Sequence, residues 1–348
     1  MKAVGALVAA LLLMLLLAAP PAAAQPVSPP AGKAIYGLIE TRQYELAEKT
    51  LQAELRNRPR WETGHLLLAQ VYNQTRRFDL ARASALNAFH IRESLDALML
   101  VASAAMELGN LNESIEWLEK AAGRWPDHAE IYRILGMDYA LGGMLRESEM
   151  ALRRAVELQP ANWEYHYLEG RVLYDLNRHR ESEKELRQAT ELDPSSVKAW
   201  TGLGQVQERF LDFAGARRSY ARALDHCPDS GRDCAWPLLQ LGVLESREGA
   251  SRTAEAYLRR AIQARPDWAK PHFYVAKLRL AEDDLAGARA GFEESVRLDP
   301  EKPEYHYQLA NVCRQMGLEE RATLHFARFR EISALQRKSK QPVLLAQP

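Results

Sequence analysis

The stretch WTGLGQVQERFLDFAGARRSYARALDHCP, which runs from Trp200 to Pro228, decides the fold. It holds large, small and helix-ending residues in an order typical of one self-complementary helical hairpin: Trp200, Leu203, Gly204, Ala216, Tyr220, Ala223 and Pro228. If Val197 is taken as position 1, these residues stand at positions 4, 7, 8, 20, 24, 27 and 32 of a unit of 34 residues.

The same positions recur along the whole chain. Repeats begin at Ser28, Glu62, Leu95, Ala129, Trp163, Val197, Ala235, Ala269 and Pro303. Position 20 is Ala or Ser in all nine, and position 8 is Gly or Ala in eight of them. A side chain larger than a methyl group at either position would push two crossing helices apart. The pattern therefore predicts nine close helix pairs, with two helices of about 14 residues in each.

Two further positions support the hairpins. Position 24 is bulky in eight repeats, where it fills the space beside the crossing. Seven repeats close on a proline, which cannot continue the second helix: Pro59, Pro126, Pro160, Pro194, Pro228, Pro266 and Pro300. Gly142, Gly143 and Asn177 fall between the paired helices, where a left-handed backbone is useful.

With these positions the chain resembles the tetratricopeptide repeat family. The resemblance implies an all-α fold, an α-solenoid wound as a right-handed superhelix of about nine hairpins, and a binding scaffold. Each hairpin is too small to bury its own apolar face, so neighbours stack and stability becomes a sum of repeat and interface terms. We expect one array over residues 33–340.

The ends of the chain carry other signals. Met1 and Lys2 precede an apolar run over 3–19 and an A-x-A site, which predicts a signal peptide over 1–24. A Pro-rich spacer over 25–32 and a disordered tail over 341–348 are also expected. Cleavage would leave no membrane span and a periplasmic or secreted protein. An uncleaved N-terminal membrane anchor is the alternative, since the run is at the short end of spanning length.

The three cysteines divide into a pair and a single residue. Cys227 and Cys234 flank four extra residues between the sixth and seventh repeats. In an exported chain they predict a disulfide, and in a reducing compartment they would be free thiols. Cys313, inside the last repeat, is expected to be buried packing.

Composition and motifs argue against several functions. Lys plus Arg and Asp plus Glu both number 46, so the charge balance argues against nucleic-acid binding. The common hydrolase, metalloprotease and nucleotide-binding motifs are missing, so we expect neither an enzyme nor a cofactor. A shared place at position 4 favours packing over metal binding for His166, His272 and His306.

The resemblance also implies where a partner binds. In that family, positions 2, 5, 9, 12 and 13 of the first helix line the concave side. The corresponding candidates here are Tyr167, Arg171, Tyr174, Gln205, Arg209, Phe273, Lys277, Tyr307, Asn311 and Arg314. Tyr and Arg are enriched at binding hot spots. Packing between adjacent repeats is the alternative interpretation for some of them.

The partner's class follows from the same surface. We expect an extended peptide segment of a partner protein. A carbohydrate of polysaccharide export or wall assembly is a second hypothesis, and self-association through the array ends is a third. Family members that clamp a chaperone's terminal carboxylate carry Lys and Asn at set positions, and no three consecutive repeats here match them.

Overall fold

The computed structural model describes residues 29–227 and 231–340. Within these ranges the chain forms eighteen α-helices and one short 3-10 helix, and no strand. None of the described helices combines the length and the apolar character that a bilayer crossing requires. The expected signal peptide, 1–24, and the expected disordered tail, 341–348, lie outside the described residues.

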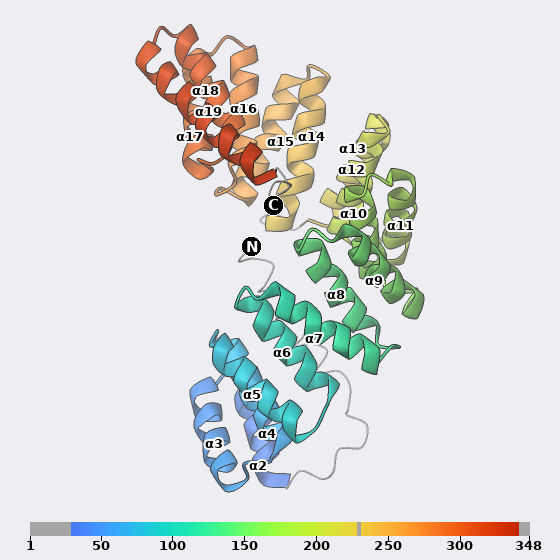
Figure 1. The fold of residues 1–348 in the computed structure, drawn as a ribbon. Helices are drawn as coiled ribbons and strands as arrows, with labels where there is room; N and C mark the ends of the chain where they lie inside the picture. Colours follow the sequence, from blue (N-terminus) through green and yellow to red (C-terminus); the bar gives the residue numbers. More distant parts are fainter. Residues whose placement is uncertain (1–28, 228–230, 341–348) are drawn as a thin grey trace, which may run out of the picture. The chain divides into compact units, whose positions relative to one another are not determined.

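The helices fall into two compact units, divided between Asn177 and Arg178. Figure 1 labels the helices along the chain. The first unit contains α2 (Pro29–Glu40), α3 (Tyr44–Asn57), α4 (Glu62–Gln74), α5 (Phe78–Ile91), α6 (Leu95–Glu107), α7 (Leu111–Arg124), α8 (Ala129–Leu141), α9 (Leu145–Leu158) and α10 (Trp163–Asp175). Repeats contact only their neighbours, so a stack of nine has no common core that would join all of them in one compact unit. The single array over 33–340 stays a prediction.

The second unit begins with the other helix of the fifth repeat. It contains α11 (His179–Leu192), α12 (Val197–Arg209), α13 (Phe213–Asp225), η1 (Arg232–Cys234), α14 (Ala235–Arg247), α15 (Ser251–Ala264), α16 (Ala269–Ala281), α17 (Leu285–Leu298), α18 (Pro303–Gln315) and α19 (Glu319–Lys340). Helix α19 has 22 residues, so the last hairpin continues to Lys340 as the sequence predicted.

The helix boundaries repeat with the sequence period. Eight first helices begin at position 1 of their repeat, and all nine second helices begin at position 17. Helix α2 begins at Pro29, inside the spacer expected over 25–32, and proline is well tolerated in the first turn of a helix. That spacer boundary is therefore corrected, and its earlier residues lie outside the described part of the chain.

The turn inside each hairpin has the same backbone conformation. Position 15 has a positive φ, between 58° and 81°, in all nine repeats, including Gly143 and Asn177. A residue in this left-handed region ends a helix, because its amide turns back to bond a carbonyl of the last helical turn. Gly142, in contrast, has a right-handed φ of −77°.

The close crossing predicted at positions 8, 20 and 24 is present. A methyl group on Gly204 would lie 2.5 Å from Cε1 of Tyr220, which is itself fully buried. Gly136 and Gly242 meet Leu152 and Leu258 in the same way, at 2.5 and 2.7 Å. The bulky side chain at position 24 therefore occupies the space that a side chain at position 8 would need.

Position 4 joins four of the repeats to the turn before them. The ring nitrogen Nε2 of His166 lies 3.0 Å from the carbonyl oxygen of Pro160, and His65 and His306 contact Pro59 and Pro300 in the same way. Trp200 Nε1 donates to Pro194 across 2.8 Å. Because a carbonyl only accepts, each histidine must donate from Nε2. The contacts of His166 and His306 agree with the packing interpretation. His272, at the same position, has a buried Nε2 atom with no hydrogen-bond partner among the described residues.

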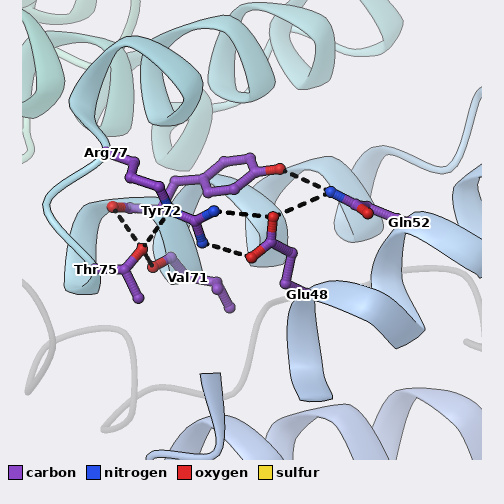
Figure 2. Close-up of polar contacts among 6 residues, drawn as sticks. All are labelled: Glu48, Gln52, Val71, Tyr72, Thr75 and Arg77. Atoms are coloured by element: carbon purple, nitrogen blue, oxygen red, sulfur yellow. Dashed lines mark hydrogen bonds and ion pairs between the residues drawn. The ribbon is translucent and has the colours of Figure 1, made fainter. Parts of the chain in front are cut away.

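Charged side chains also connect successive repeats (Figure 2). Arg77, at the start of α5, donates to both carboxylate oxygens of Glu48 on α3, at 3.0 and 2.5 Å. Its guanidinium lies 4.6 Å from the ring centroid of Tyr72, whose hydroxyl accepts from Gln52. The hydrogen bond from Arg77 lowers the pKa of Glu48. Pairs this exposed contribute at most about 1 kcal/mol each, so they orient repeats more than they stabilise them.

The inserted loop lies between α13 and α14. The structure joins Cys227 and Cys234 as a disulfide, with their Cα atoms 5.7 Å apart. Cys234 is buried against the first turns of α14, whereas Cys313 is a buried free cysteine in α18. Residues 228–230 are not described.

Enlarging the crossing residues should destabilise the fold. Gly204→Leu or Ala216→Leu should lower the free energy of unfolding by about 1–3 kcal/mol, because both sites are fully packed. Ala214→Leu is the matched control, since Ala214 is exposed on the same helix as Ala216. Denaturant unfolding measures all three, and equal losses at Ala214 and Ala216 would contradict the assigned packing.

The disulfide can be tested by counting thiols. Protein purified without reductant from an oxidising compartment should show one reactive thiol after denaturation, that of Cys313, and three after reduction. A loop of this size should contribute roughly 2.5 kcal/mol to stability, which Cys227→Ser/Cys234→Ser should remove. Three thiols before reduction would show that the pair is free.

Candidate functional site

The predicted residues of the first unit form one stripe on α10. Tyr167, Arg171 and Tyr174 stand on consecutive turns, and all three are half-buried. Arg171 donates through Nη1 to the hydroxyl of Tyr167 at 3.4 Å, and the ring of Trp163 lies 6.3 Å from that of Tyr167. The buried Nε of Arg171 has no hydrogen-bond partner among the described residues. The stripe on α10 therefore presents aromatic rings beside an N–H donor that has no acceptor in the described part of the chain.

In the second unit, the last repeat gathers three predicted residues. Tyr307 is 42% exposed, and its ring lies 6.0 and 5.3 Å from those of Phe326 and Phe329 on α19. The guanidinium of Arg314 lies over Phe326 and donates to Asn311 across 3.1 Å. An aromatic and basic patch results. The ring contacts of Tyr307 also support the packing interpretation, because α19 is the second helix of the same hairpin.

The remaining predicted residues differ in exposure. Gln205 is half-buried on α12, while Arg209 and Lys277 are exposed on α12 and α16. Phe273 is only 2% exposed and packs against Phe292 and Tyr305, with ring centroids 5.4 and 4.9 Å away. A partner cannot reach a side chain buried this deeply, so the expectation for Phe273 is corrected.

Two residues near α12 and α14 were missed by the sequence analysis. Oε1 of Glu208 accepts from the hydroxyl of Tyr220 at 2.6 Å and from Nε2 of Gln240 at 3.1 Å. Glu208 also lies 3.7 Å from Arg247. Glu208 and Gln240 stand at positions 12 and 6. Position 6 was not among the positions that the resemblance implied, so no sequence signal marked Gln240.

A pocket of about 570 Å³ opens between the N-terminal ends of α16 and α18. Its apolar wall includes Trp268, Phe273, Leu298 and Tyr305, and Lys270 and Lys302 also line it. Trp268 stacks on Trp236 with ring centroids 5.3 Å apart. A signal was present in the sequence: position 2 is Trp236 in the seventh repeat and Lys270 in the eighth, whereas it is Asp or Glu in the third to fifth repeats and again Glu304 in the ninth.

In the first unit, the equivalent positions of the fourth repeat are occupied by a buried ion pair. Arg133 and Glu130, at positions 5 and 2 of the fourth repeat, are 2% and 7% exposed and form a two-pronged contact. The hydroxyl of Tyr165, from the next repeat, lies 3.4 Å from the same carboxylate. Nearby, Ser114 donates to Asp138 across 2.6 Å. Burial raises the pKa of Asp138 to about 6, although Ser114 and Arg133 lower it.

Paired helices, a tight crossing and half-exposed first-helix positions define a repeat scaffold that is typical of protein interaction. Models of the tetratricopeptide repeat match residues 34–92, 95–128 and 167–231. The chain contains tetratricopeptide repeats. The prediction of an all-α solenoid of such hairpins is confirmed. This fold is typically a non-enzymatic scaffold that binds protein or peptide partners.

Comparison with individual proteins shows the same fold. The BBSome complex member BBS4 of Bos taurus is 22% identical over 253 residues, which are 71% of this chain and 47% of that protein. This chain thus aligns with about half the length of that relative. The APC/C hetero-tetramer Cut9-Hcn1 superposes with a TM-score of 0.58 at 15% identity, over 83% of this chain and 56% of that one. PilF of Pseudomonas aeruginosa gives 0.53 at 15% identity, over 61% and 99%.

The buried carboxyl group of Asp138 predicts a pH-dependent effect. Its folded-state pKa lies above the unfolded value of 3.8, so the folded state prefers the neutral acid and loses stability as pH rises from about 4 to 6. Asp138→Asn cannot ionise. Its free energy of unfolding relative to wild type should therefore rise by about 1–3 kcal/mol between pH 4 and pH 7.5. Unfolding at both pH values measures the change.

Asp175→Asn serves as the control, because Asp175 is exposed in the same unit. Its difference from wild type should hardly change with pH. If Asp138→Asn behaves in the same way, Asp138 ionises as freely as a surface residue and the prediction is wrong.

Proposed function

We propose that the protein is a non-enzymatic scaffold that holds an extended peptide segment of a partner protein on its first-helix surfaces. The observation that carries the proposal is the stripe on α10. There, Tyr167, Arg171 and Tyr174 remain half-exposed in a repeat whose core positions are otherwise filled. Tyrosine and arginine provide large contact areas with polar ends, which is why they dominate binding hot spots.

The unsatisfied guanidinium atom of Arg171 supports a polar partner. A buried donor without an acceptor costs about 1–3 kcal/mol, and a partner's carbonyl or carboxylate oxygen would remove that cost. The neighbouring rings of Trp163 and Tyr167 would contact an apolar or aromatic side chain. The stripe therefore favours an extended segment that combines acidic and aromatic residues.

The proposed compartment is the cell envelope or the secreted fraction. This part rests on the sequence of residues 1–24, with its charged start, apolar run and A-x-A site. The bonded Cys227–Cys234 pair is compatible with an oxidising compartment. An N-terminal membrane anchor is the alternative, and N-terminal sequencing of the mature protein distinguishes the two.

A carbohydrate is the second candidate partner. The tilted Trp163–Tyr167 pair supports it, because aromatic faces also stack on the apolar faces of sugar rings. Retention on a glycan resin, competed by oligosaccharide and not by peptide, would favour this partner over a protein.

Loss of the stripe should abolish capture of a partner. Tyr167→Ala/Arg171→Ala should reduce recovery of a specific protein from envelope extract at least tenfold, as expected when two hot-spot side chains are removed. Affinity capture followed by quantitative mass spectrometry measures the loss. Thermal unfolding must show that the variant is folded.

The matched control is Arg146→Ala/Met150→Ala on α9. These two residues are exposed and have the same four-residue spacing, but they lie on a second helix. Their replacement should leave capture unchanged. Equal recovery by wild type and by the α10 variant would exclude the stripe as the binding surface.

A further inference from the structure

The pocket between α16 and α18 has two lysines and no counter-ion for either. Within the described part of the second unit, Lys270 and Lys302 form no ion pair. The ammonium group of Lys270 lies 5.1 Å from the ring centroid of Trp236. Trp236 in turn stacks on Trp268, which forms a wall of the pocket. A partly buried cation thus faces an open cavity.

The electrostatic surroundings make this arrangement costly. Burial lowers the pKa of Lys270, and the nearby charge of Lys302 lowers it further, whereas Glu304 and Glu208 act in the opposite direction. Burial also raises the pKa of Tyr305, at the base of the pocket, to about 12, with Asp299 and Glu304 adding to the effect. An anion brought close to Lys270 would reduce the cost of keeping that lysine charged.

Another repeat of the same chain shows how a charge at position 2 can be neutralised. In the fourth repeat, position 2 is Glu130, and it is paired with Arg133 at position 5 under Tyr165 of the next repeat. In the eighth repeat the same three positions carry Lys270, Phe273 and Tyr305. The charge at position 2 is reversed, and the residue at position 5 is apolar. Glu304 lies near enough to act on Lys270, but the two form no ion pair. The paired neighbour that Glu130 has in the fourth repeat is therefore not reproduced here, and the pocket lies beside Lys270.

We propose that this pocket binds a carboxylate that stands next to an aromatic or apolar side chain in a peptide segment of the partner. Lys270 and Lys302 pair with the carboxylate, and the apolar side chain rests on Trp268 and Leu298. A volume of about 570 Å³ is within the usual range for sites of this size. This inference rests on the proposed peptide-binding function and names a second place of contact for it.

The acidic residues at the pocket limit the ligand to one negative group. Asp267 is paired with Arg232 at 3.1 Å and lies 3.8 Å from Arg265, so its charge is balanced. Asp299 and Glu304 also line the pocket and would repel a polyanion. A single carboxylate beside a hydrophobic side chain fits this balance better than a phosphate or a run of acidic residues.

Three unlabelled peptides test the proposal by isothermal titration calorimetry. The first is acetyl-Gly-Gly-Phe-Glu-Gly-amide, and the second replaces Glu by Gln. The third is acetyl-Gly-Gly-Gln-Phe with a free terminal carboxylate. Wild type should bind an acidic probe about tenfold more tightly than the neutral one, the gain expected of a charge-assisted hydrogen bond. The first and third probes show whether a side-chain or a terminal carboxylate is preferred.

Two variants place the binding in this pocket. Lys270→Met and Lys302→Met should each remove most of the preference for the acidic probe. The second variant keeps the lysine that covers Trp236 and so guards against an effect on folding. Lys184→Met, exposed on α11, should bind as wild type does. The acidic probe should also protect Lys270 from acetylation in the wild type, and the neutral probe should not.

Equal binding of acidic and neutral probes by the wild type would overturn the proposal. So would an unchanged preference in both pocket variants. The proposed function is tested separately, because capture of the partner that depends on Tyr167 and Arg171 can persist when these probes show no preference. In that case the pocket assignment falls and the α10 surface stands.

Discussion

The close crossing of the two helices in each hairpin is the constraint on which the rest depends. Gly204 can lie against Tyr220 only because it has no side chain, and Gly136 and Gly242 meet their leucines in the same way. With the crossing this tight, the bulky residue at position 24 is fixed in the core, and the opposite side of the first helix is left for other uses. The proposed binding stripe lies on those remaining positions of α10, and the pocket uses the first turns of α16 and α18 together with the end of α17.

The sequence predicted the helices well because this constraint repeats. The positions of small residues gave the start of nearly every first helix, and the left-handed turn residue recurs at position 15 in each hairpin. The candidate site was harder to predict from the sequence. The family pattern indicates which residues share a helix face, but the burial of Phe273 depends on contacts with Phe292 and Tyr305 from other helices. Whether Lys270 forms an ion pair likewise depends on the side chains that other helices place beside it.

The two units use equivalent positions in opposite ways. In the first unit, Arg133 and Glu130 neutralise each other out of solvent, which closes the space and makes the repeat interface rigid. In the second unit, Lys270 has no such neighbour, and a cavity remains. Burying an ion without a counter-charge is costly, so a fold that retains one at a pocket gains most when something else supplies the charge.

The closed loop after α13 also has a mechanical consequence. The two bonded cysteines are seven positions apart in the sequence, and such a segment would span about 24 Å if it were pulled straight. With the bond formed, the two Cα atoms stay 5.7 Å apart. A pulling force along the chain would therefore be transmitted from the sixth hairpin to the seventh through the disulfide. Under tension this junction would not lengthen, whereas the uncrosslinked turns elsewhere could yield.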